Sequence, residues 1–160
     1  HNQNLKDISV LAELTNLTTL SLVNCNISDF NVLEELTNLT ELYVTIPFKD
    51  VNVLAGLTNL NLLVLSSCYD LTDISALAGL TNLTTLRFMS CYSLIDISTL
   101  AGLTNLTELR FDSCYYLTDI SPLAGLTNLT ELTFGYCSGL TNSQVRELQS
   151  KLPNTSIIRY

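Results

Sequence analysis

The sequence predicts a solenoid of the α/β class, in which short strands stack into one parallel sheet and short turns return the chain. The first observation is the phrase Leu-Thr-Asn-Leu, which occurs six times and begins at residues 14, 36, 57, 80, 103 and 126. The second is its period, because successive copies are 22, 21, 23, 23 and 23 residues apart. A fixed period of this size is typical of repeat architectures, whose units bury their apolar edges on their neighbours.

The residues after each phrase predict a short strand. In the first copy the apolar pattern is L-x-x-L-x-L-x-x-C-x-I, from Leu17 to Ile27. Alternation of period two directs one set of side chains to the core and the other to solvent. The expected inward pairs are Leu20 and Leu22, Leu42 and Val44, Leu63 and Leu65, Leu86 and Phe88, Leu109 and Phe111, and Leu132 and Phe134.

The segments that return the chain are short, as in Asp73–Gly79. Such a segment is too short for a full α-helix, so turns or 3-10 pieces are expected on this side. The sequence therefore predicts a sheet on one side and irregular or 3-10 structure on the other.

The repeats resemble the leucine-rich repeats of bacterial internalins. The resemblance is carried by Asn26-Ile27-Ser28-Asp29, by Leu33 and by Leu36–Leu39. In later copies, the run from Cys68 to Ile74 is similar to cysteine-containing leucine-rich repeats. The resemblance covers nearly the whole chain. It implies a right-handed leucine-rich-repeat solenoid with a parallel concave sheet, used to bind other proteins at a bacterial surface or after secretion, with a cytoplasmic location left open.

Three segments are expected along the chain. Residues 1–13 form a partial first repeat, residues 14–140 form six leucine-rich repeats, and residues 141–160 form a C-terminal cap. In the cap, Thr141 and Gln144 have the spacing of a capping box that opens a helix, and residues 155–160 have the pattern of a last strand. Because the first repeat is incomplete, we expect a fragment of a larger bacterial protein.

Two polar columns run through the repeats. Five cysteines share one repeat position, which favours buried reduced thiols facing the carbonyls of the next coil over disulfides or a zinc site. Aspartates share another position, and each is expected to accept N–H bonds of its own turn rather than to hold a cation. The members are Cys25, Cys68, Cys91, Cys114 and Cys137, and Asp7, Asp29, Asp50, Asp73, Asp96 and Asp119.

The second copy departs from the pattern, because its turn Thr45–Asp50 has no cysteine. Two interpretations stay open. Ile46 and Phe48 form a projecting apolar tip, or one of them fills the space left by the missing cysteine.

Composition and motifs argue against several functions. The net charge of −8, with 15 acidic and 7 basic residues, disfavours nucleic acid as a partner. No apolar run reaches the roughly 18 residues that a membrane span requires. The one histidine is His1, and there is no phosphate-binding loop or nucleophile motif, so neither a catalytic function nor a cofactor is expected.

The solvent side of the sheet is the predicted site, because the other repeat positions belong to the core. Apolar residues next to arginines and acids resemble the composition of protein interfaces. The residues predicted to bind a protein partner are Tyr43, Leu62, Val64, Arg87, Met89, Glu108, Arg110 and Asp112.

Two alternative functions are weighed against protein binding. Tyr69, Tyr92 and Tyr115 follow their cysteines directly and are expected to stack in a row on one rim, where they could hold a carbohydrate. The chain could also be a structural spacer in a multidomain surface protein.

Overall fold

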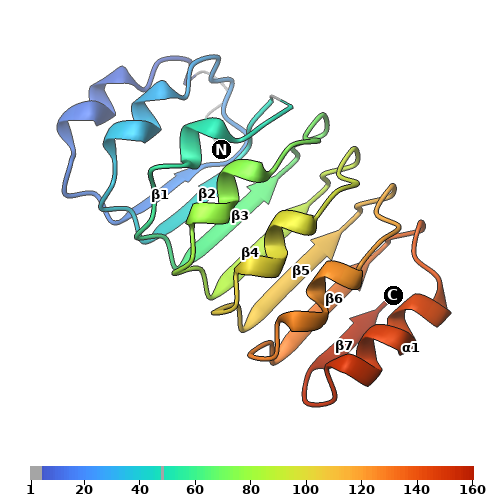
Figure 1. Cartoon of the computed structure of the whole chain (residues 1–160). Coiled ribbons are helices and arrows are strands. Elements are labelled where there is room, and N and C mark those ends of the chain that lie inside the picture. Colours follow the sequence, from blue (N-terminus) through green and yellow to red (C-terminus); the bar gives the residue numbers. More distant parts are fainter. Residues whose placement is uncertain (1–4, 48) are drawn as a thin grey trace.

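A computed structural model describes residues 5–47 and 49–160 of the chain. Seven strands form one parallel sheet in the order β1-β2-β3-β4-β5-β6-β7, so each strand pairs with the strand of the neighbouring coil (Figure 1). The strands are β1 Thr19–Leu22, β2 Glu41–Val44, β3 Leu62–Ser66, β4 Thr85–Met89, β5 Glu108–Asp112, β6 Glu131–Gly135 and β7 Ser156–Arg159. The predicted solenoid with a parallel sheet is confirmed.

The strand register aligns equivalent repeat positions across the sheet. Leu86 on β4 pairs with Leu63 on β3 and with Leu109 on β5, and these three leucines are fully buried. The next inward column contains three phenylalanines on β4, β5 and β6, whose ring centroids are 5.3 Å apart for Phe88 and Phe111 and 5.6 Å apart for Phe111 and Phe134. One leucine and phenylalanine core therefore runs through all coils, as the alternation predicts.

The other side of the solenoid consists of short 3-10 helices, as expected from the length of these segments. They are η1 Ser9–Glu13, η2 Asn31–Glu35, η3 Asn52–Leu54, η4 Ser75–Gly79, η5 Ser98–Gly102 and η6 Ser121–Gly125. From η2 onward each carries one fully buried leucine, such as Leu77 in η4 and Leu123 in η6. These leucines close the core opposite the strands.

Side-chain hydrogen bonds link consecutive coils at the repeated phrase. The Nδ2 of Asn38 donates to the carbonyl of Thr15 at 2.8 Å, and Asn59, Asn82, Asn105 and Asn128 repeat the bond. The Oγ1 of Thr40 donates to the carbonyl of Thr18 at 3.1 Å, two residues farther along. The Asn-x-Thr triplets of the repeat thus have a structural explanation, since both polar side chains bridge to the preceding coil.

The C-terminal segment forms a helix and a strand. Helix α1 spans Asn142–Lys151, and both bonds of the expected capping box between Thr141 and Gln144 are present. Leu148 and Leu152 are 3% and 2% exposed, so the helix packs on the end of the core. No helix in residues 5–47 and 49–160 is long and apolar enough to cross a membrane. The division of the chain at residues 13 and 140 stays a prediction.

Candidate binding face

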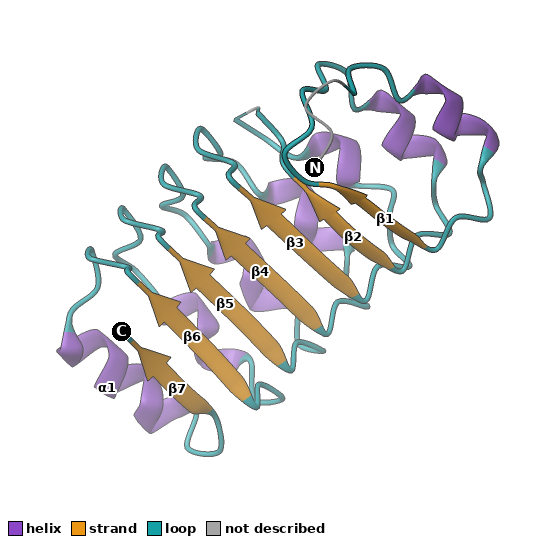
Figure 2. Cartoon of the chain, turned by 180° about the vertical axis from the view of Figure 1, so that it is seen from behind, coloured by secondary structure: helices purple, strands orange, loops and turns teal. Residues whose placement is uncertain are grey.

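The candidate site is the face of the sheet that no 3-10 helix covers, turned toward the viewer in Figure 2. Strand alternation and register arrange its side chains in three columns across the strands. The central column is Ser21, Tyr43, Val64, Arg87, Arg110, Thr133 and Ile158. One flanking column contains Leu62 and Glu108, and the other contains Met89 and Asp112.

The apolar members of this face differ in exposure. Tyr43 and Leu62 are half-buried, and Met89 is 36% exposed. Val64 is only 6% exposed, so its expected accessibility is wrong. It pairs in register with Tyr43 on one side and Arg87 on the other, and we attribute its low exposure to these longer side chains. Val64 is absent from the hydrophobic core cluster, as its outward position requires.

Two ion pairs order the charged side chains of this face. The Nε of Arg87 donates to Glu108 across strands at 2.8 Å, and its Nη2 lies 2.7 Å from the same carboxylate oxygen. The Nη2 of Arg110 lies 2.7 Å from Asp112 and donates to the hydroxyl of Tyr160 at 2.6 Å. The hydrogen bond to Asp112 is the largest cause of a raised pKa at Arg110. The structure thus gathers these four predicted residues in two adjacent pairs.

Two members of this face, Ile158 and Tyr160, are missing from the sequence-based prediction. Ile158 is 42% exposed and Tyr160 is 55% exposed. Tyr160 lies against β6 at Gly135, where an added Cβ would be 3.0 Å from the tyrosine ring and 2.6 Å from an oxygen of Asp112. Continuing the alternation of period two into residues 155–160 would have identified both residues.

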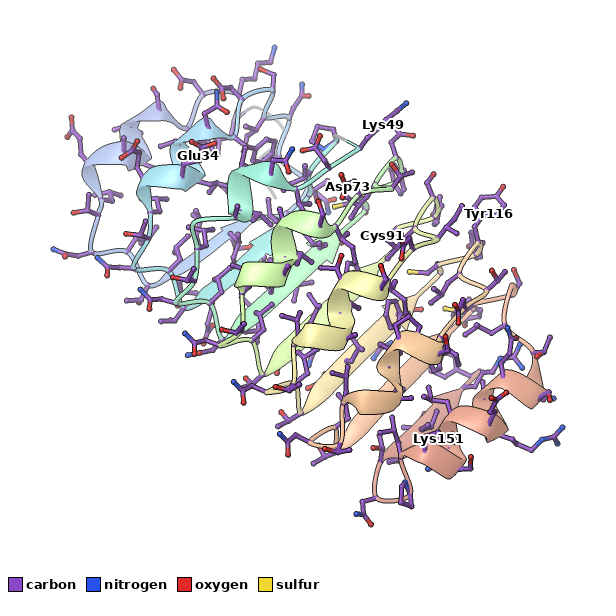
Figure 3. The ribbon with its side chains drawn as sticks, viewed as in Figure 1. Glu34, Lys49, Asp73, Cys91, Tyr116 and Lys151 are labelled. Carbon is purple, nitrogen blue, oxygen red and sulfur yellow. The ribbon has the colours of Figure 1, made fainter. Side chains whose placement is uncertain are left out.

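The cysteine column is present as free thiols. Cys68, Cys91, Cys114 and Cys137 are buried, whereas Cys25 is half-buried. In Figure 3, Cys91 lies near the loop after β4, and further sulfur atoms lie near the neighbouring loops.

The hydrogen bonds of these thiols correct one expectation. Cys91 and Cys137 donate to carbonyls of the preceding coil, those of Leu65 at 3.7 Å and Phe111 at 3.6 Å, not to the next coil. The reverse direction is used by the backbone, because the N–H of Ile46 donates to the sulfur of Cys68 at 3.3 Å. A hydrogen bond with Cys68 and burial raise the pKa of the Cys91 thiol. This thiol is therefore protonated at neutral pH and poorly nucleophilic.

The position of Ile46 decides, for this residue, between a projecting tip and a side chain that fills the space of the missing cysteine. Its side chain is fully buried and takes the place of a cysteine in the column, so it does not project. Phe48 lies outside the described residues.

The aspartate column forms turns. Each carboxylate accepts the N–H of the residue two positions ahead, as when Ser75 donates to Asp73 at 2.8 Å. This backbone bond is the largest cause of a lowered pKa at Asp73 and, with Ser98, at Asp96. Within residues 5–47 and 49–160, no three His, Cys, Asp or Glu residues are grouped to hold a metal ion. The bonding expected for these aspartates is confirmed.

The tyrosine row on the rim is also present. Ring centroids are 5.0 Å apart between Tyr69 and Tyr92 and again between Tyr92 and Tyr115. Tyr116, labelled in Figure 3, is 62% exposed and lies beside the row in sequence. The stacking expected from the equal spacing is confirmed, and a ligand for the row stays a prediction.

Comparison with known proteins adds a family and several solved structures. The family model for a BspA type leucine rich repeat region matches six copies over residues 42–157. No curated protein matches the chain. The structure of internalin C2 from Listeria monocytogenes is 30% identical, with a TM-score of 0.71, and the match covers 99% of this chain and 78% of that chain.

Two further structures share the fold at lower identity. The functional domain of InlJ from Listeria monocytogenes, described as including a cysteine ladder, is 20% identical with a TM-score of 0.69. The match covers 99% of this chain and 37% of that chain. A leucine-rich-repeat protein of Leptospira interrogans is 20% identical with a TM-score of 0.66, over 93% of this chain and 44% of that chain.

Proposed function

Because the chain belongs to the BspA type leucine rich repeat family, we propose that it is a non-catalytic module that binds a protein partner on its concave face. The resemblance to internalins is confirmed by the similarity to internalin C2. The leucine-rich-repeat fold is generally a protein-interaction module. The concave location of the site and the absence of catalysis belong to the proposal.

The observation that carries the proposal is the composition of the face around β2–β5. Tyr43, Leu62 and Met89 offer apolar surface, and the Arg87–Glu108 and Arg110–Asp112 pairs lie beside them. Aromatic, Met and Arg side chains are enriched in the centres of protein interfaces. The ion pairs already restrict the arginine side chains. Binding a partner would therefore cost little further conformational entropy at these residues.

The charge of the chain supports a protein over a nucleic acid. The net charge of −8 would repel a phosphate backbone. A protein partner with basic residues would instead be attracted at long range. The relatives are bacterial leucine-rich-repeat proteins, and we place this module at the bacterial surface or outside the cell.

A comparative capture experiment tests the proposal. Three immobilised proteins are exposed to the same protein extract: the wild type, a concave variant with Tyr43→Ala and Arg87→Ala, and a convex control with Glu35→Gln. Glu35 is exposed on η2, on the opposite side of the solenoid. Circular dichroism first checks that all three are folded.

The proposal predicts at least one protein that is recovered by the wild type and the convex control but lost with the concave variant. The same protein should bind in purified form. Equal recovery by all three proteins, for every protein captured, would contradict a concave site.

A further inference from the structure

The tyrosine stack on the rim spans coils three to five and is not continued by the sixth coil. In coils three to five the residue after the cysteine is Tyr69, Tyr92 or Tyr115, and in the sixth coil it is Ser138. Consecutive rings are 5.0 Å apart. The position that would continue the row in the sixth coil belongs to Ser138, whose side chain has no ring. Among the described residues, no tyrosine is therefore stacked on the far side of the Tyr115 ring.

A pocket of about 460 Å³ lies at this place. It is lined by Tyr115, Tyr136, Cys137, Ser138, Asn142, Arg159 and Tyr160. Tyr136 and Tyr160 form an edge-to-face pair with centroids 5.5 Å apart, which makes an aromatic wall. The volume is within the range of about 300–1,000 Å³ that is usual for small-molecule sites.

The turn beside the pocket is held close to the fifth coil. Gly139 follows Ser138, and an added Cβ at Gly139 would be 2.8 Å from the carbonyl oxygen of Tyr115 and 2.6 Å from that of Leu117. A side chain at this position would push the turn outward. The fixed turn keeps Ser138 at the end of the stack.

The polar groups of the pocket come from the cap. Arg159 donates through Nη2 to the carbonyl of Leu140 at 2.6 Å and through Nη1 to the side chain of Asn142. It is the one charged residue among the described residues that line the pocket. Since a guanidinium has five N–H donors, others remain for a ligand.

The local charge also favours an anion here. Residues 136–160 contain Arg146, Lys151 and Arg159 but only one acid, Glu147, so this segment is net positive in a chain of net charge −8. An anionic ligand is repelled by the chain as a whole and attracted at this end.

We propose that this pocket binds a carboxylated sugar, with the pyranose ring stacked on Tyr115 and the carboxylate at Arg159. Arginine recognises carboxylates with two parallel N–H bonds, and a tyrosine face accommodates the apolar side of a sugar ring. The site shares Tyr160 with the concave face proposed to bind protein, but its other walls are the rim turn and the cap.

A sugar fits this pocket better than an aromatic side chain of a peptide. Hydroxyl, amide and guanidinium groups of Ser138, Asn142, Tyr136 and Arg159 line the space around a ring stacked on Tyr115. A pyranose presents hydroxyls to these groups, whereas a benzene ring would offer their remaining donors and acceptors no hydrogen bond. Unpaired polar groups in a filled site reduce affinity strongly.

The test uses NMR chemical-shift titration of the whole chain, labelled with ¹⁵N, with three probes. Methyl β-D-glucuronide carries the ring and the carboxylate, methyl β-D-glucoside carries the ring alone, and N-acetyl-tyrosine carries an aromatic ring with a carboxylate. We expect the glucuronide to shift the amides around Ser138, Asn142 and Arg159 with a Kd of about 1 mM, as suits a small ligand. The glucoside should bind about tenfold more weakly.

Variants locate the ligand in the pocket. Ser138→Tyr should extend the stack by one ring, fill the pocket and abolish detectable binding while the melting temperature is kept. Tyr115→Ala should weaken the glucuronide about tenfold, whereas Tyr69→Ala, at the other end of the stack, should leave its Kd within about twofold. Arg159→Gln should weaken the glucuronide to the level of the glucoside, with Arg146→Gln as the matched control.

Several results would overturn the inference. Absence of glucuronide shifts in the folded wild type would exclude the site, and unchanged binding by Ser138→Tyr would place the ligand elsewhere. Equal affinity for glucoside and glucuronide would remove the role of Arg159. Binding of N-acetyl-tyrosine without binding of the glucuronide would assign the pocket to an aromatic peptide.

Discussion

The first and last repeats of the array differ in how completely the same positions are buried. Leu20 on β1 is half-buried, whereas the equivalent Leu132 on β6 is fully buried. The described strands explain this difference, because β1 pairs only with β2, whereas β6 lies between β5 and β7. Helix α1 adds a cover at the C-terminal end (Figure 1). In a solenoid, the stability contributed by a residue at a given repeat position therefore depends on how many neighbouring coils cover it.

The two halves also differ in their packing. The inward aromatic column Phe88, Phe111 and Phe134 and the tyrosine row belong to the later coils, where β3 to β6 have five residues each. The strands β1 and β2 have four residues each, and their inward positions are aliphatic. Ring stacking adds specific geometry to area burial, so the later coils should be the more rigid part.

The largest expected difference concerns the cysteines. Cys25 is half-buried, whereas Cys68, Cys91, Cys114 and Cys137 are buried. In the native protein, a thiol reagent should label Cys25 at least about 100-fold faster than the other four, because those react only after local opening. Mass spectrometry of labelled peptides over time measures these rates. In denaturant all five should react, and missing free thiols there would contradict the reduced column.

A matched pair of core substitutions tests this difference between the first and the later coils through the free energy of unfolding. Leu109→Ala creates a cavity between two neighbouring strands and should lower the free energy of unfolding by about 2–5 kcal/mol. Leu20→Ala, at the same repeat position on β1, should cost only about 1 kcal/mol because the side chain is partly exposed. Urea denaturation followed by circular dichroism compares them. Equal losses of unfolding free energy in the two variants would show that the neighbouring coils do not determine how much a core leucine stabilises the fold.

The smallest effect is expected in acid. Folding lowers the pKa of Asp7, Asp73, Asp96 and Asp119 below the ordinary value of 3.8. A carboxylate with a depressed pKa stabilises the fold above pH 3.8, and this stabilisation is lost as the pH falls through the lower folded-state pKa. Three of these four aspartates lie in the later coils.

The acid effect is measured by melting temperature between pH 5 and pH 2. Exchanging Asp73, Asp96 and Asp119 for Asn keeps an acceptor oxygen for the turn but removes the titration. This variant should lose less stability in acid than the wild type. An identical decline in both proteins would exclude these carboxylates as the cause.

The sequence was sufficient to predict the strands, the 3-10 side, the thiol column and the tyrosine stack, because each depends on repeat position. The exposure of Val64 could not be predicted, because it depends on the lengths of Tyr43 and Arg87 on adjacent strands. Ile46 was ambiguous, since an apolar residue in a turn suits either a projection or a filled gap. The fit of Tyr160 over Gly135 depends on a close approach between the cap and β6 that has no repeat signature.

The most direct test of the central claim is the affinity of a purified partner for single variants, measured beside their melting temperatures. Tyr43→Ala and Arg87→Ala should each weaken binding by more than about 1 kcal/mol while the melting temperature is unchanged, as expected for residues at the centre of an interface. Thr19→Ala, at the edge of the face, should have little effect. If the Tyr43 and Arg87 variants bound normally while changes at Tyr69, Tyr92 and Tyr115 abolished binding, the partner site would lie on the rim and the concave-face account would be wrong.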